Sequence, residues 1–479
     1  MRLARLLGLV LGLLVVTSGR SSALELEPCG EQFGESALCG WAEVSEDRAD
    51  PESRKIRLRV VVLPSRGEAA AEPVVMFPGG PGQATTTLIP LASQLYPGVL
   101  ESRDAVFIGQ RGSGESNAMH CLEGLTSDPA LVFGALWNRE RMRECHERTL
   151  EFADPSHYTT AEYVADVAEV LDLLGYERIV IWGGSGGTRI GQAFIRENPE
   201  RVLAAVLDGV TPIDYAMPLP FSEYAQRAWQ RVVDDCTSQP DCAGAYPALA
   251  ADFDALLRSV AEAPVSTVIS AGDGSPATVQ VGAGDLAYAV RGILYNSRAT
   301  AKLPAEIHRA ARSGDLSFFA QSLYDRARAL LGGVVAVGLH IASYCAEDIP
   351  RLAAVDIEAA TRGTFIGSYL VDEYRGACEA FPVPAASQEW YRAFESSVPT
   401  LLLSGYYDPS TPDLSAERVQ RSLPNSRHIV VRNSGHGAGF TCARSVVEDF
   451  LVSASLDGVV DPCADEPIHF EVRAGESGG

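Results

Sequence analysis

Ser185 has the sequence context of a catalytic nucleophile. An apolar run at residues 179–182 leads into a Gly-x-Ser-x-Gly motif at 183–187, and a helical pattern follows. At a sharp strand-to-helix turn the serine hydroxyl is exposed above the sheet, and glycines two residues away relieve the crowding of the turn. The motif alone is weak evidence in a chain with 44 glycines, because a helix-capping serine in a tight loop has the same spacing.

The C-terminal part of the chain offers the two partners that a nucleophilic serine needs, a base and an orienting carboxylate. Asp408 follows a predicted strand at residues 400–403, and His436 follows another at 428–432. The chain order Ser185, Asp408, His436 is that of the α/β-hydrolase triad. Asp208 is a rival carboxylate because it also follows a strand, but Asp408 is preferred since it lies between the serine and the histidine.

Acyl transfer also needs donors for the oxyanion. The N–H of Gly186, next to the nucleophile, is one predicted donor. The second is Gly80 in the Gly-Gly-Pro-Gly turn, because Pro81 has no N–H. By itself such a cluster is equally typical of a plain turn. This chemistry requires no metal and no cofactor, and the lack of a Cys-x-x-Cys pair argues against zinc.

Composition and charge limit the classes of partner. The 479 residues suffice for a large core and an inserted domain. Apolar residues make up 46% and charged residues 21%, as in ordinary globular proteins. The net charge of −23 argues against nucleic acid and anionic membrane surfaces as main partners, since both repel an acidic surface.

Residues 1–23 have the pattern of a secretory signal peptide. Arg2 and Arg5 precede an apolar run at 6–16, and small residues continue to Ala23. The run is short for a membrane span, although an uncleaved anchor is the alternative. We expect an exported protein, periplasmic or secreted, without stable membrane association after signal cleavage.

All ten cysteines follow this segment, and an even number in an exported protein indicates disulfides. Spacing does not prove their connectivity. Neighbours in the sequence predict five local pairs: Cys29–Cys39, Cys121–Cys145, Cys236–Cys242, Cys345–Cys378 and Cys442–Cys463.

The fold class predicted is α/β, because short apolar runs alternate with helical patterns. This rhythm indicates a mainly parallel sheet with helices on both faces, and places reactive groups on loops at the carboxyl ends of the strands. We assign residues 24–55 to a polar N-terminal leader, 56–215 to the first part of the core, 216–390 to an inserted helical cap and 391–479 to the C-terminal part of the core.

The cap is expected to be helical, without short buried strands. Its four clearest helical patterns lie at residues 225–233, 248–261, 284–295 and 304–313. The Gly/Glu-rich tail after Pro467 is expected to be loose.

Four motifs in register resemble the prolyl iminopeptidase and tripeptidyl-aminopeptidase group of α/β-hydrolases: Gly-Gly-Pro-Gly at 79–82, Gln-Arg-Gly-Ser-Gly-Glu-Ser at 110–116, Gly-Gly-Ser-Gly-Gly-Thr at 183–188 and Gly-His-Gly at 435–437. The resemblance covers residues 56–463 and is weakest across the cap. It implies serine peptidase chemistry that releases residues or short peptides from a free N-terminus. It also implies acidic residues near the cap that bind the substrate ammonium group. Glu347 and Glu223 are the candidates, and a solvated surface carboxylate is the alternative for each.

The sequence departs from the group's pattern at three positions. Pro78 stands where a histidine is usual, Gly109 where an aspartate is usual, and Gly186 where an aromatic residue is usual. The change at Gly186 leaves the N–H donor intact but removes a side chain from the pocket. It therefore bears on substrate preference more than on reactivity.

We expect an exported serine hydrolase that acts as an aminopeptidase on peptides. The first alternative is an exported carboxylesterase with the same triad, because acyl transfer is common to both. A non-catalytic binding protein on a hydrolase scaffold is less favoured, since every triad position is filled.

Overall fold

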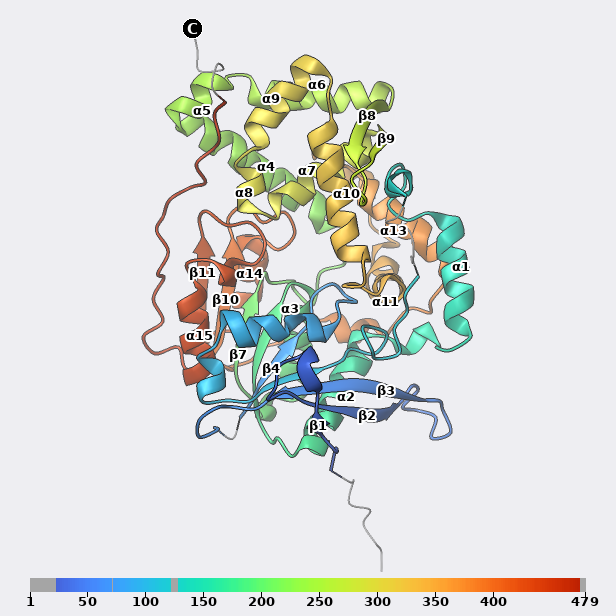
Figure 1. Cartoon of the computed structure of the whole chain (residues 1–479), viewed down its shortest axis with the longest axis vertical. Helices are drawn as coiled ribbons and strands as arrows, with labels where there is room; N and C mark the ends of the chain where they lie inside the picture. The colour runs from blue at the N-terminus through green and yellow to red at the C-terminus, as the bar shows by residue number, and fades with distance from the viewer. Residues whose placement is uncertain (1–22, 71, 122–127, 474–479) are drawn as a thin grey trace, which may run out of the picture.

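The apolar runs of the sequence form one large sheet in the computed structural model, which describes residues 23–70, 72–121 and 128–473 (Figure 1). Residues 1–22 of the predicted signal peptide lie outside the described residues. Within the described residues, no helix is both long and apolar enough to cross a membrane.

The main sheet has nine strands in the described part of the chain, in the order β1-β2-β3-β5-β4-β6-β7-β10-β11. From β5 to β11 neighbouring strands are parallel, while β1, β2 and β3 are antiparallel additions. The predicted, mainly parallel sheet is therefore confirmed. Its strands are β1 (Glu27–Pro28), β2 (Leu38–Ser45), β3 (Lys55–Leu63), β4 (Val74–Phe77), β5 (Ala105–Ile108), β6 (Ile179–Gly184), β7 (Val202–Asp208), β10 (Thr400–Gly405) and β11 (Ser426–Val431).

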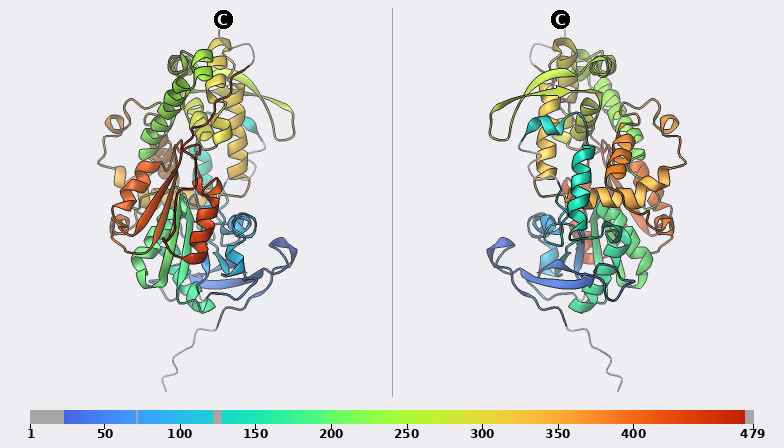
Figure 2. Two further views of the ribbon diagram at one scale, coloured as in Figure 1. Left: turned by 90° about the vertical axis from the view of Figure 1, so that its left-hand side faces the viewer. Right: turned by 90° about the vertical axis from the view of Figure 1, so that its right-hand side faces the viewer.

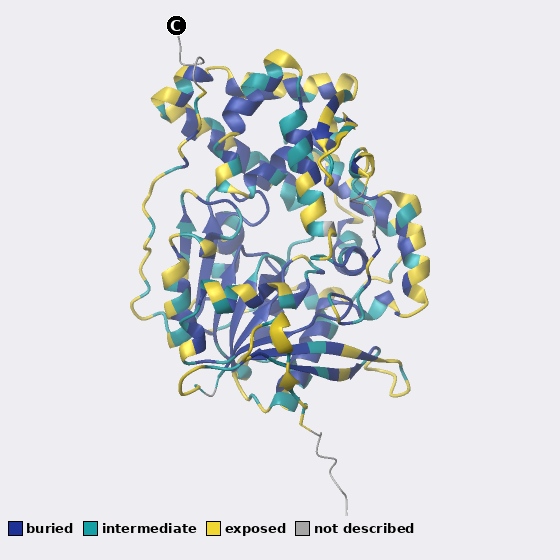
Figure 3. Cartoon of the chain, viewed as in Figure 1, coloured by how far each residue is buried: buried dark blue, intermediate teal, exposed yellow. Residues whose placement is uncertain are grey.

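Helices cover both faces of the sheet, as expected. Helices α2 (Thr160–Leu174) and α3 (Gly186–Glu197) pack on one face with α14 (Asp413–Gln420), while α15 (Arg444–Ser453) packs on the other. Alternate side chains of a strand point to opposite faces. Accordingly Ala205 belongs to the cluster under α3 and Val206 to the cluster under α15. Figure 3 shows the central strands of the sheet buried between these layers, while the outer strands carry exposed residues.

A helical layer lies beyond the carboxyl ends of the parallel strands (Figure 1). Helices occupy all four expected positions in it, as α4, α6, α7 and α9. The limits of a separate cap domain stay a prediction. The helices are α4 (Pro220–Ser238), α5 (Pro240–Ala245), α6 (Leu249–Glu262), α7 (Ala283–Leu294), α8 (Ser297–Thr300), α9 (Leu303–Ser313) and α10 (Ser317–Leu331).

The region is not entirely helical as was expected, because it also contains two half-buried strands. Strands β8 (Val265–Ser270) and β9 (Pro276–Val281) form an antiparallel hairpin, which curves away from the cap helices (Figure 2). Only alternate residues, such as Ile269 and Val279, are buried. Because only one face of the hairpin is apolar, its sequence lacks the continuous apolar run that marks a buried strand.

A second group of helices includes α1 (Arg139–Leu150), which lies within the range expected for the core. It packs against α13 (Tyr369–Ala380) and α11 (Val337–Ser343) of the range expected for the cap. The short helices η8 (Tyr344–Asp348), η9 (Ile349–Leu352) and α12 (Ile357–Thr361) connect α11 to α13.

Both ends of the described chain pack against the fold, although the tail was expected to be loose. The polar leader supplies strands β1 and β2 of the sheet. The segment after α15 runs along the molecule to the cap (Figure 1), where Ile468 and Phe470, just beyond Pro467, are buried in the main cap cluster. The side-chain amide of Gln239 donates to the Ile468 carbonyl (2.8 Å). The tail is thus anchored through these apolar contacts, at least to residue 473.

All ten cysteines form disulfides, in the five pairs predicted from their spacing. The Cα–Cα distances range from 5.0 Å for Cys121–Cys145 to 5.3 Å for Cys345–Cys378 and Cys442–Cys463. These separations lie inside the range that a disulfide spans. Disulfides of this number are typical of proteins that fold in an oxidising compartment.

Candidate active site

Ser185 occupies a strained turn between β6 and α3. Its backbone has φ 53° and ψ −121°, a conformation that costs a non-glycine residue about 1–3 kcal/mol. The N–H of Ser185 donates to the Asp208 carbonyl (2.8 Å), which holds the turn against β7. A Cβ on Gly183 would lie 2.6 Å from the Gly187 oxygen, and one on Gly187 would lie 2.4 Å from the Phe77 oxygen. Both glycines are therefore required by the close approach of backbone.

Asp408 and His436 are joined directly at the carboxyl ends of β10 and β11. The imidazole Nδ1 lies 2.7 Å from Asp408 Oδ2. The carboxylate is 1% exposed and accepts the N–H groups of Ser410 (2.8 Å) and Thr411 (3.0 Å) as well as the Thr411 hydroxyl (2.6 Å). These bonds leave the carboxylate little freedom to turn away from the imidazole.

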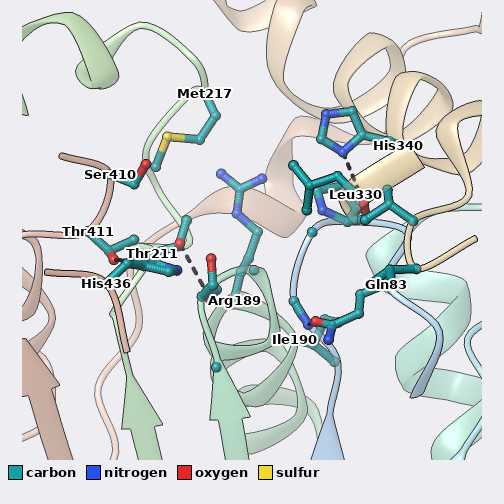
Figure 4. A pocket seen from close by; sticks show the side chains of 18 of the residues that line it. Gln83, Arg189, Ile190, Thr211, Met217, Leu330, His340, Ser410, Thr411 and His436 are labelled. Atoms are coloured by element: carbon teal, nitrogen blue, oxygen red, sulfur yellow. Dashed lines mark hydrogen bonds between the residues drawn. The ribbon is translucent and has the colours of Figure 1, made fainter. Parts of the chain in front are cut away.

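The cap also holds the histidine. The backbone N–H of His436 donates to the carbonyl of Tyr295 (2.9 Å), directly after α7, and the two rings lie 4.9 Å apart. Ser185 and His436 line the same cavity, although in the described residues no hydrogen bond joins the serine hydroxyl to the imidazole. Figure 4 shows Thr411 and His436 on one side of this cavity, opposite His340.

Asp208 is buried at the end of β7 but is not the carboxylate that bonds to the histidine. Its Oδ2 accepts the N–H of Gly439 (3.1 Å), and its Oδ1 has no partner among the described residues. Burial raises the pKa of Asp208 to about 6, although the nearby His436 lowers it. Of the two carboxylates considered from the sequence, Asp408 is the one that contacts His436.

The Asp408–His436 pair shifts the ionisation of both groups. Burial alone would lower the pKa of His436, but the charge and hydrogen bond of Asp408 raise it to about 9. Burial alone would raise the pKa of Asp408, but His436 and the bonds from Thr411 hold it below its usual value. The pair therefore favours a carboxylate beside an imidazolium, which is the charge state that a general base reaches after taking a proton.

Gly80 and Gly186 lie next to each other at the turn that holds Ser185. A Cβ on Gly186 would lie 3.0 Å from the Gly80 oxygen and 3.2 Å from its nitrogen. No described residue accepts a hydrogen bond from either N–H. Two free donors thus lie side by side next to Ser185, at the N-terminus of α3, where the helix dipole adds positive potential.

The cavity holds about 520 Å³ and is bounded by core loops below and by cap residues above. Its aromatic wall comes from cap-side helices, with Tyr344 and Tyr374 stacked at 4.2 Å. His340 Nε2 lies 2.6 Å from the Tyr374 hydroxyl, and burial lowers the pKa of His340 to about 4. His340 is therefore uncharged at neutral pH, and these aromatic rings line the cavity although Gly186 carries no side chain.

Glu347 lines this cavity and is 2% exposed. It accepts the N–H (2.5 Å) and the hydroxyl (2.9 Å) of Thr160, and one oxygen lies 4.0 Å from Arg189. Burial raises the pKa of Glu347 to about 7 despite that arginine. Glu223, in contrast, is exposed on α4 and does not line the cavity, so the structure does not bring it to the site.

Several residues of the site were missed from the sequence. Thr411 could have been found, because Asp-Pro-Ser-Thr is typical of a turn in which the aspartate accepts local N–H groups. Arg291 lies on the apolar face of α7, and a charge at such a position is a usable signal. Arg189 and Asp348, which pair at 2.9 Å, carry no comparable signal.

Arg111 and Ser116 of the motif at 110–116 serve the fold rather than the chemistry. Arg111 is completely buried and makes a bidentate pair with Asp166, with both bonds at 2.7 Å. A Cβ on Gly109 would lie 2.0 Å from the Ser116 hydroxyl, which leaves no space for the aspartate usual there.

Within the described residues, no group of three or more His, Cys, Asp or Glu side chains could hold a metal ion.

Known proteins of similar sequence identify the fold family of the chain. Residues 72–441 match the model of the alpha/beta hydrolase fold family. The serine protease Hip1 of Mycobacterium tuberculosis is 26% identical over 459 residues, covering 89% of this chain and 86% of that protein. The proline iminopeptidase of Neisseria gonorrhoeae is 27% identical over 145 residues, which is 30% of this chain and 34% of that protein. The crystal structure of the proline iminopeptidase of Mycobacterium smegmatis covers 86% of this chain and 100% of its own, with 15% identity and a TM-score of 0.40. The chain therefore belongs to the α/β-hydrolase fold family and is a serine hydrolase.

Proposed function

We propose that the protein is an exported aminopeptidase with Ser185 as nucleophile, His436 as general base and Asp408 as the orienting carboxylate. The observation that carries the triad is the 2.7 Å contact between His436 and the buried Asp408, beside a strained serine turn. His436 takes the Ser185 proton as the hydroxyl oxygen attacks the scissile carbonyl. The N–H groups of Gly80 and Gly186 stabilise the oxyanion. His436 then gives its proton to the leaving amine, and water hydrolyses the acyl-enzyme with His436 again as base.

Glu347 is the proposed receptor for the substrate's amino terminus. It is a buried carboxylate on the cavity wall, and a bound ammonium ion would supply the positive partner that favours its charged form. The relatives support peptides as substrates, since Hip1 is named a serine protease and the Neisseria gonorrhoeae relative a proline iminopeptidase. The cavity is lined by aromatic side chains that suit an apolar or proline-like residue next to the scissile bond.

Export is proposed on two observations. The N-terminal residues have the pattern of a signal peptide, and five disulfides join all ten cysteines. Disulfides persist in oxidising compartments and are rare in the cytosol.

Replacing Glu347 with glutamine is expected to lower kcat/KM for free-amino peptide amides by about 10- to 100-fold. Glutamine keeps the shape but loses the charge, and a hydrogen bond between charged groups contributes about 1.5–3 kcal/mol. Rates are measured on matched peptide amides with a free or an acetylated amino group, and on a simple ester. The ester rate should change little, because an ester of this kind has no ammonium group.

The exposed Glu223 provides the matched control, and Glu223→Gln should leave all three rates unchanged. Equal cleavage of free and acetylated peptides by the wild-type enzyme would exclude the aminopeptidase assignment. Hydrolysis of the ester alone would instead favour the carboxylesterase.

The ionisation of His436 predicts activity that increases into the alkaline range. The imidazole accepts the serine proton only when it is neutral, so kcat/KM should increase about tenfold per pH unit up to its pKa of about 9. An ester substrate without an amino group isolates this effect, because Glu347 and substrate amines titrate in the same range. Initial rates from pH 6 to 10 measure the profile, and a flat profile between pH 7 and 9 would contradict it.

A further inference from the structure

Two arginines of the cavity have no carboxylate partner among the described residues. Arg291 of α7 and Arg326 of α10 both line the cavity, and Arg291 is only 4% exposed. In the part of the chain that the structure describes, no carboxylate oxygen lies within 4.0 Å of either guanidinium. The third arginine of the cavity, Arg189, pairs instead with both oxygens of Asp348. Because buried charges are usually paired, the isolated pair of cations calls for a partner.

Aromatic rings and hydroxyl groups, rather than carboxylates, hold the two guanidinium groups in place. Arg326 lies 4.0 Å from the centre of the Tyr295 ring, and Arg291 lies 4.4 Å from that of Phe221. Arg291 also donates to the hydroxyls of Tyr295 (3.0 Å) and Ser410. The Nε atoms of both arginines are buried and have no acceptor among the described residues. Donors therefore remain available on two positioned cations.

The two arginines adjoin the side of the site on which the leaving group departs. Tyr295 contacts both of them, and its ring lies 4.9 Å from that of His436. His436 gives a proton to the leaving amine. The groups that pack around His436 therefore contact the part of the substrate beyond the scissile bond. Glu347 is bonded to Thr160 at the start of α2 and lies 4.0 Å from the third arginine, Arg189.

We propose that Arg291 and Arg326 form an anion subsite that binds a carboxylate on the leaving-group portion of the substrate. A guanidinium group matches a carboxylate with two parallel hydrogen bonds, and the match is strongest where water is excluded. The carboxylate is either the free C-terminus of a short peptide or an acidic side chain directly after the scissile bond. This inference rests on the proposed peptidase function. Together with Glu347, the subsite makes the enzyme selective for substrates that carry a positive charge at one end and a negative charge at the other.

The test compares three peptides with the same free amino terminus and scissile bond. In the first, the residue after this bond ends in a free carboxylate; in the second it ends in an amide; in the third it is an amidated glutamate. Binding to the Ser185→Ala variant is measured by calorimetry, which requires no turnover, and kcat/KM is measured on the wild-type enzyme. At least one carboxylate peptide should bind about tenfold more tightly than the neutral amide. The first or the third peptide, whichever is favoured, identifies the source of the carboxylate.

Substitution of Arg326 by glutamine should bring the ratio of affinities for the carboxylate and the amide peptides to about one. Lysine at the same position should restore part of the preference. Arg328, two residues further along α10 and exposed, provides the matched control. The Arg328→Gln variant should retain the full preference. Equal binding of all three peptides by Ser185→Ala, or a preference that survives Arg326→Gln, would overturn the subsite.

Failure of the proposed aminopeptidase function would give a different experimental result. In that case acetylated and free-amino peptides are cleaved equally or not at all. The carboxylate preference measured by calorimetry stands or fails independently of that result.

Discussion

Replacement of Ser185 by alanine is expected to lower kcat by about a millionfold while leaving the fold intact. The variant removes only the attacking oxygen, and loss of the nucleophile in a triad typically has an effect of about this size. Alanine takes the same strained backbone as serine at φ 53°, and the turn is held by the Ser185 N–H and by Gly183 and Gly187 rather than by the hydroxyl. Steady-state rates on a free-amino peptide amide and on an ester provide the measurement.

Two controls make this result specific. The melting temperature and circular dichroism of the variant should match those of the wild-type protein. A serine-directed organophosphonate should label the wild-type protein at one residue, Ser185, and fail to label the variant. Activity that survives the substitution, with labelling at another residue, would remove Ser185 from the mechanism.

Replacement of Asp408 by asparagine is expected to lower kcat by about 10⁴-fold. Asparagine keeps the size of the side chain but can present an N–H to Nδ1 of His436, which favours the wrong tautomer of the imidazole. The substitution also removes the charge that raises the pKa of His436, so the acid limb of the pH profile should move to lower pH. The backbone N–H groups of Ser410 and Thr411 keep Oδ1 as their acceptor in asparagine, whereas the Thr411 hydroxyl loses the oxygen to which it donates.

Asp208 offers a matched control for this prediction. It is also buried, also follows a strand and also lies near His436, but it bonds to Gly439 and not to the imidazole. The Asp208→Asn variant should therefore lose less than about tenfold in kcat, as expected of a charge that acts only at a distance. If Asp208→Asn proved the more damaging substitution, the carboxylate of the triad would have to be reassigned.

The fold class and the five disulfides followed from local features of the sequence. Each strand of the core is a short apolar run with its own boundaries, and Gly175 ends α2 in the left-handed conformation, as its position predicts. The disulfide partners are neighbours in the chain, separated by at most 33 residues. Local chain geometry is sufficient to bring such residues together.

The positions of Ser185, Asp408 and His436 were predictable for a related reason. Each follows a strand of one parallel sheet, and the carboxyl ends of such strands meet at the same edge. The order of the residues in the chain therefore carried information about their arrangement in space. The hairpin of β8 and β9 had no such signal, because only one of its faces is buried.

Only the tertiary structure decided what the cavity can bind. Glu347 and Glu223 were both candidates from the sequence, yet the first is buried beside Thr160 and the second is exposed on α4. Arg291 and Arg326 meet at Tyr295 although they lie on different helices. The sequence by itself determined the fold class, the disulfide pairs and the residues proposed for the triad, because these depend on strand ends and near neighbours. Which charges line the cavity depends on how separate cap helices pack over the core. The sequence did not determine this packing, because a helical pattern identifies the apolar face of a helix but not the element that covers it.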